Sequence, residues 1–244
     1  MSKKFNITVW NEESGQGVYP EGIHNAIAAF FRSDEKTGRF GKIRTAILDE
    51  PEHGLSQDVL DDTDVLIWWG HIFHDKVEDV IVERVRQRVL SGMGLIVLHS
   101  GHASKIFRTM LGTDTQNLRW READERERVW IIEHNHPITS GVGECIEIPE
   151  SEMYGEYFNI PAPDELICIS WFAGGEVFRS GCTFKRGNGK IFYFAPGHET
   201  YRIYDMPQVQ QILKNAACWA APVGYPEIAA GHHPDSPESM CKKV

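Results

Sequence analysis

The sequence predicts an α/β fold with three layers, in which antiparallel hairpins extend a parallel β-sheet. Residues 65–69 and 94–98 are short, unbroken apolar runs, which are typical of strands buried on both faces. An amphipathic helix pattern separates them, and a strand–helix–strand unit places its two strands parallel and close together. In the second half, Gly174-Gly175 and Asn188-Gly189 favour two-residue hairpins between strand-like segments.

The N-terminal third alternates between strand and helix patterns. Residues 6–10 are β-branched and aromatic, which favours a first strand. Apolar residues at three- and four-residue spacing predict an amphipathic helix over 22–32. Residues 42–48 predict a second strand and 56–60 a short helical turn, before the buried strand at 65–69.

The clearest helix is predicted over residues 75–91. Asp75 can cap its N-terminus, and Gly92 can end it. The central strand, 94–98, follows at once and leads through a sharp turn into a helical pattern at 103–111.

The second half of the chain has a different character. The pattern is loose over 112–133, where we expect the run of charged residues to be a solvated face. Strand-like segments at 166–172, 177–185 and 190–194 predict antiparallel hairpins. A final helix is predicted over 206–220.

Length and charge narrow the class of protein. A chain of 244 residues can bury a substantial core, and we expect one domain over residues 1–222 and a C-terminal tail over 223–244. The formal net charge of −10 argues against nucleic acid or a membrane surface as partner, because both attract clustered Lys and Arg. The negative charge favours a small neutral or cationic ligand.

Five scattered cysteines indicate a reducing compartment. No signal peptide or membrane span is recognisable, so we expect a cytoplasmic protein.

Polar side chains follow the predicted parallel strands, at the sheet edge where open α/β folds place their chemistry. Imidazole and carboxylate groups are the usual zinc ligands. The candidate ligands for a divalent metal, zinc first, are His71, His99, His102 and His198. The alternative interpretation is that some of them are hydrogen-bonded or helix-capping loop histidines.

Four residues are candidates for catalysis. His99 and His198 each follow a buried strand, which would hold them rigidly as acid/base groups. Glu152 would orient a histidine or bind a hydroxyl, and Tyr154 could donate to a developing oxyanion or pack against a sugar.

Substrate-binding candidates come from the same edge and from the aromatic residues. Indole faces stack on sugars and carboxylates accept hydrogen bonds from hydroxyls, although the core is the favoured place for Trp69. Ser100 stands at a strand-to-helix turn that resembles a nucleophile elbow, but a helix N-cap is its favoured role. The candidates are Trp69, His71, Ser100, Trp171 and Glu199.

Seven motifs together resemble the ThuA-like trehalose-utilisation family over roughly residues 5–222. They are Trp68-Trp69-Gly70-His71, the segment from Gly92 to His102, Trp120-Arg121-Glu122, His136-Pro137-Ile138, Glu152-Met153-Tyr154-Gly155-Glu156, Phe178-Arg179-Ser180-Gly181-Cys182 and the segment from Phe192 to Glu199. The resemblance implies a flavodoxin-like fold of the class I glutamine amidotransferase type. It also implies a role in disaccharide or glycoside catabolism, on a sugar or 3-keto-sugar derivative.

The resemblance leaves the activity open. True amidotransferases carry a cysteine at the elbow where this chain has His99 and Ser100, so we expect no glutamine hydrolysis. The alternative to a sugar-processing enzyme is a non-catalytic sugar-binding or accessory protein with a vestigial pocket. We also expect a homo-oligomer, because the segment 118–130 and the tail have no obvious place in one compact domain.

Overall fold

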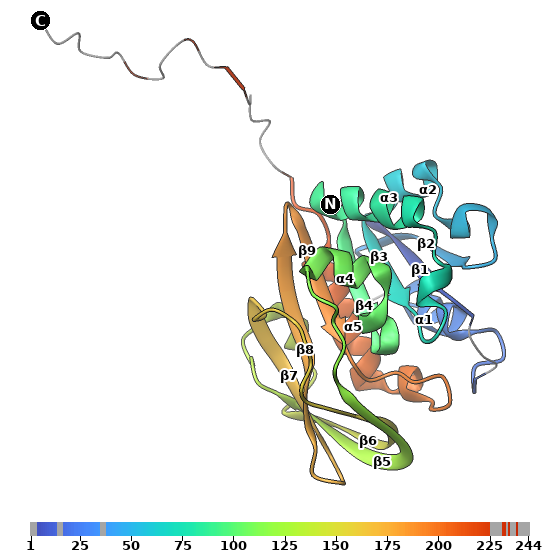
Figure 1. The fold of residues 1–244 in the computed structure, drawn as a ribbon, viewed down its shortest axis with the longest axis vertical. Coiled ribbons are helices and arrows are strands. Elements are labelled where there is room, and N and C mark those ends of the chain that lie inside the picture. Colours follow the sequence, from blue (N-terminus) through green and yellow to red (C-terminus); the bar gives the residue numbers. More distant parts are fainter. Residues whose placement is uncertain are drawn as a thin grey trace, which may run out of the picture.

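The computed structural model describes residues 4–13, 17–34, 38–224, 231, 232, 234 and 238. Within them one mixed sheet separates two layers of helices (Figure 1). Its parallel half runs, in spatial order, through β2 (Phe40–Ile47), β1 (Phe5–Asn11), β3 (Val65–Trp69), β4 (Gly94–Leu98) and β9 (Gly189–Phe194). Its antiparallel half continues through β8 (Val177–Arg186), β7 (Glu165–Phe172), β5 (Arg119–Ile131) and β6 (Cys145–Gly155). The predicted fold class is confirmed.

Alternating side chains divide the core into two parts. On β3, Trp69 packs on the side of one helix pair, and Trp68 packs on the side of the other helices. The first pair is α1 (Ile23–Arg32) and α5 (Pro207–Ala220), and the others are α2 (Gln57–Asp61), α3 (Asp79–Leu90) and α4 (Lys105–Leu111). Because both faces are covered, β3 and β4 are apolar throughout.

Helix α3 begins at Asp79, so the predicted start and cap at Asp75 were wrong. Asp75 belongs to a short 3-10 turn, and Val77 after it has extended backbone with ψ 123°. The side chain of Val77 is buried in the core. Packing of this one residue therefore outweighs the local capping signal.

The charged segment is largely solvated, as expected, but it is also a long strand. β5 pairs with β6 along most of its length and with β7 at its C-terminal end. The segment 118–130 therefore lies in the chain's own sheet, so it no longer supports self-association. Self-association stays a prediction. Most of the predicted tail, 223–244, lies outside the described residues.

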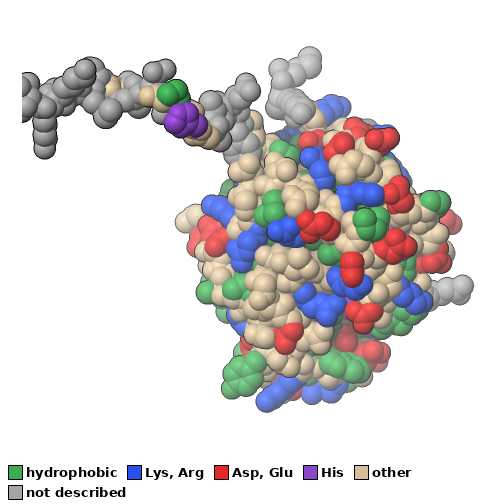
Figure 2. Space-filling model, turned by 45° about the horizontal axis from the view of Figure 1, so that its top comes forward, with side chains coloured by type: hydrophobic (Ala, Val, Ile, Leu, Met, Phe, Trp, Pro, Cys, Tyr) green, Lys and Arg blue, Asp and Glu red, His purple; other side chains and the backbone are tan. Residues whose placement is uncertain are grey.

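The charged side chains of both signs share the surface of the molecule (Figure 2). On the face in Figure 2, Lys and Arg side chains are intermixed with Asp and Glu side chains. No helix in the described part of the chain is long and apolar enough to span a membrane.

Glu127 is a carboxylate fully buried in the antiparallel half of the sheet. The hydroxyl of Ser151 on β6 donates a hydrogen bond to it at 2.8 Å, and the hydroxyl of Ser170 on β7 donates another. Burial raises the pKa of Glu127 from 4.5 to about 7, although both serines act in the opposite direction.

We therefore expect the free energy of unfolding to decrease as the pH rises from 4.5 through 7. In this window the unfolded chain releases the Glu127 proton while the folded chain keeps it, so deprotonation favours unfolding. Between pH 5 and pH 8, urea unfolding should show the free energy of unfolding of the wild type falling by about 2.5 kcal/mol more than that of Glu127→Gln, which has no proton to lose. The same pH dependence in both proteins would contradict this assignment.

Candidate functional site

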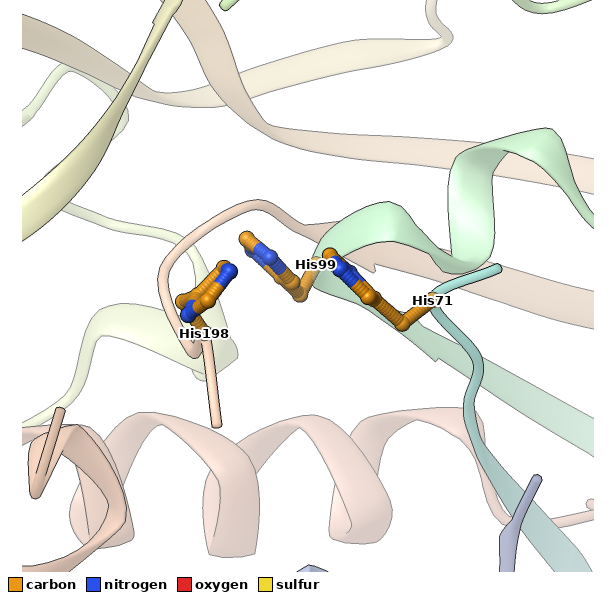
Figure 3. Close-up of side chains that lie close together, drawn as sticks. All are labelled: His71, His99 and His198. Atoms are coloured by element: carbon orange, nitrogen blue, oxygen red, sulfur yellow. The ribbon is translucent and has the colours of Figure 1, made fainter. Parts of the chain in front are cut away.

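Three histidines meet at the carboxyl edge of the parallel half of the sheet. His71, His99 and His198 follow β3, β4 and β9, which are neighbours in the sheet (Figure 3). Parallel strands lie about 4.8 Å apart, so loops that leave adjacent strands deliver their side chains close together. One ring nitrogen from each histidine lies within 4.8 Å of those of the other two.

His99 is fixed at the centre of this group. It has a φ of 52° directly after β4, a left-handed conformation that non-glycine residues rarely adopt. Its Nδ1 donates to the carbonyl of Ala195 at 3.0 Å, because a carbonyl can only accept. Its Nε2 therefore faces the carboxylate of Glu152 at 3.1 Å and the hydroxyl of Tyr154 at 3.3 Å. All of these side chains are buried.

The environment of Glu152 and Tyr154 determines their protonation. Burial raises the pKa of Glu152, but its interactions with His99 and the nearby imidazoles outweigh burial and lower that pKa below its ordinary value. Burial holds the pKa of Tyr154 well above 10. A carboxylate and a hydroxyl donor thus stand side by side at His99.

Ser100 connects two members of the site. Its hydroxyl lies 3.0 Å from Nδ1 of His71 and 2.7 Å from the hydroxyl of Tyr154. The predicted role of Ser100 as a helix N-cap was wrong, because Ser104 caps α4 by accepting from the N–H of Phe107 at 3.3 Å.

His198 and Glu199 close the other side. Nδ1 of His198 lies 2.8 Å from the Thr200 hydroxyl, and its Nε2 lies 3.7 Å from the Glu122 carboxylate. Burial and the adjacent His99 lower the pKa of His198 to about 4. The Glu199 carboxylate lies 3.7 Å from Nε2 of His71.

Two predicted site residues lie beside or behind this group. His102 donates from Nδ1 to the carbonyl of Thr115 at 3.0 Å, and burial lowers its pKa to about 3. It is not among the histidines whose nitrogens converge, although it lines the cavity. Trp69 is buried, and its indole N–H donates to the Gly197 carbonyl at 3.0 Å.

Trp171 lies elsewhere, on β7. The guanidinium groups of Arg126 and Arg128 cover its ring, 6.0 and 5.5 Å from the ring centre. It is not part of the wall of the cavity.

A cavity of about 460 Å³ opens in front of these residues. Its lining is His71, Ile72, His74, Ser100, His102, Ala103, Gln116, Asn117, Leu118, Trp120, Glu122, Glu152 and Tyr154. None of these is a lysine or an arginine. The residues from Gln116 to Glu122 are absent from the sequence-based candidates, because their charged context indicated a solvated face. The one available signal was the motif Trp120-Arg121-Glu122.

The chain matches one protein-family model and resembles several solved structures. The ThuA family model, described as trehalose utilisation, matches residues 6–220. No curated protein matches the sequence. Among solved structures, a protein from Parabacteroides merdae described as ThuA-like has a TM-score of 0.65 at 14% identity, covering 92% of this chain and 94% of its own.

Two further solved structures are similar in fold. A cytoplasmic protein from Salmonella typhimurium has a TM-score of 0.59 at 13% identity, covering 90% of this chain and 100% of its own. PurLQS from Thermotoga maritima has a TM-score of 0.54 at 13% identity, covering 88% and 99%. At these identities the likeness establishes the fold alone.

Proposed function

The chain belongs to the ThuA family, and we propose that it is an enzyme of disaccharide or glycoside breakdown that acts on a sugar bearing a ketone, such as a 3-keto-sugar. One observation carries this proposal. The Glu152 carboxylate and the Tyr154 hydroxyl lie together beside Nε2 of His99, on the wall of the cavity. A base beside a hydrogen-bond donor suits a ketone, because the ketone oxygen can accept a hydrogen bond while the neighbouring carbon loses a proton.

The cavity has the composition that a sugar needs. Its volume is that of a small-molecule site. Gln116, Asn117 and Glu122 offer amide and carboxylate partners for hydroxyls, and Trp120 offers an aromatic face. With carboxylates and without a lysine or arginine in the lining, the cavity favours a neutral sugar over a phosphorylated one.

The paired groups support proton abstraction next to a carbonyl. A ketone acidifies the hydrogen on the neighbouring carbon, so Glu152 can remove that proton while the electron pair moves into an enolate. Tyr154 donates a hydrogen bond to the enolate oxygen. If the carbon that lost its proton bears a hydroxyl, transfer of the hydroxyl proton to the enolate oxygen and return of the abstracted proton to the former carbonyl carbon complete an isomerisation. If the next carbon bears the glycosidic oxygen, departure of that oxygen, which takes up a proton, completes an elimination.

A thiol mechanism has no support at this position. The turn after β4, where amidotransferases carry their nucleophile, holds His99 and Ser100. Cys182 is buried in β8, and burial raises its pKa to about 12. It stays a thiol inside the core, which is inert as a nucleophile.

We expect Glu152→Gln to lower kcat on the 3-keto-sugar by about 10²- to 10⁴-fold, because the amide cannot accept a proton. Product analysis by NMR should cover trehalose, sucrose and their 3-keto forms. In D₂O the wild type should also incorporate deuterium next to the ketone. The matched control is Glu150→Gln, an exposed residue of the same strand outside the cavity lining.

Two outcomes would contradict the enzyme assignment. Full turnover by Glu152→Gln would remove Glu152 as the base. Tight binding without turnover of every sugar would favour the non-catalytic sugar-binding alternative.

We expect Trp120→Ala to weaken sugar binding roughly 2- to 10-fold through loss of aromatic contact. Trp120 is 64% exposed in the cavity wall, and Trp130 on the same strand is 40% exposed outside it. Titration calorimetry of Trp120→Ala and Trp130→Ala with the same sugar measures the difference. An equal effect of the two substitutions would show that Trp120 does not contact the sugar.

A further inference from the structure

We propose that His71, His99 and His198 bind one divalent transition-metal cation of the zinc class beside the cavity. This proposal concerns cation binding alone and does not depend on the sugar chemistry. Imidazole nitrogens suit zinc and its neighbours in the first transition row. Three histidine ligands would leave a fourth coordination position for water or substrate, as in catalytic zinc sites.

Each imidazole is held by its outer nitrogen. The partners of Nδ1 are the Ser100 hydroxyl for His71 at 3.0 Å and the Ala195 carbonyl for His99 at 3.0 Å. For His198 the partner is the Thr200 hydroxyl at 2.8 Å. Metal-binding histidines characteristically donate their second N–H to such a partner, which fixes the tautomer and the ring direction. With Nδ1 engaged in this way, Nε2 is the ring nitrogen of each histidine that is available to a metal.

Carboxylates surround the inner nitrogens. Each Nε2 has one within 4 Å: Glu199 for His71 at 3.7 Å, Glu152 for His99 at 3.1 Å, and Glu122 for His198 at 3.7 Å. The lining contains no lysine or arginine to balance them. A divalent cation at the histidines would supply that balance, since buried charges are normally paired or coordinate metals.

Buried polar atoms without a partner point to the same place. Nε2 of His198, Oε2 of Glu152 and Oε2 of Glu199 are buried and have no hydrogen-bond partner in the described part of the chain. Groups of this kind are costly unless something binds them. They lie around the three imidazoles and identify where the cation would sit.

The geometry requires a small contraction. The converging nitrogens lie within 4.8 Å of one another, whereas tetrahedral ligands at 2.0–2.1 Å from zinc are about 3.4 Å apart. The Thr200 N–H donates a hydrogen bond to Nδ1 of His198 at 3.3 Å, which needs an unprotonated Nδ1. Metal binding through Nε2 would require this bond to be given up, so that Nδ1 carries the proton and donates to the Thr200 hydroxyl instead.

The test is titration of chelator-treated, untagged protein with Zn²⁺ alone and with Co²⁺ alone. We expect one equivalent per chain by calorimetry and, for Co²⁺, visible absorption of a four-coordinate ion. His71→Ala should weaken binding at least about a hundredfold, and Ser100→Ala, which removes the outer partner of His71, roughly 10- to 100-fold. His71 is the least buried of the three ligands, so its loss is the mildest for folding.

The control is His134→Ala, an exposed histidine outside the site, which should bind like the wild type. Circular dichroism of each variant verifies the fold before titration. Absence of a stoichiometric site in the wild type would overturn the proposal, and so would unchanged affinity in folded His71→Ala. Sugar turnover is not used, so this result and the test of the proposed function are independent.

Discussion

The parallel pairing of β3, β4 and β9 is the constraint on which the rest of the site depends. The three strands end at the same edge, and each is followed within four residues by a histidine. These histidines are His71, His99 and His198. His99 leaves β4 in a left-handed conformation, and its ring is fixed by the carbonyl of Ala195, which directly follows β9. The order of the strands thus fixes the direction of the His99 imidazole, because a packed sheet allows little movement of its strand ends.

Among the described residues that line the cavity at this edge there is no arginine or lysine to balance the carboxylates. Glu122, Glu152 and Glu199 stand within 4 Å of histidine nitrogens, and two of these carboxylates have a buried oxygen without a partner. Desolvated carboxylates cost free energy of folding, so the chain keeps an arrangement that is unfavourable for stability alone. Perturbed groups of this kind cluster at functional sites. The catalysis proposed for Glu152 and the cation binding proposed for His71, His99 and His198 would both depend on these uncompensated carboxylates.

The local part of this arrangement was predictable from the sequence. The apolar runs at 65–69 and 94–98 and the helix between them predicted parallel neighbours, which placed His71 and His99 at one edge. The pairing of β9 with β4 was not predictable, since it depends on how the later hairpins fold back. The position of Trp120 in the cavity wall could not be predicted, because β5 is an exposed strand of mostly charged residues and this pattern also fits a loop. At Val77, core packing outweighed the capping signal at Asp75.

The orientation of His99 is the most direct test of this account, and ¹⁵N NMR of the histidine side chains measures it. The hydrogen bond to Ala195 predicts a proton on Nδ1 of His99 at neutral pH, with Nε2 turned to Glu152 and Tyr154. Substitution of Tyr154 by Phe should then shift the Nε2 resonance and leave Nδ1 protonated. A His99 with its only proton on Nε2 would contradict the account, because the ring would then present a donor where the site needs a lone pair.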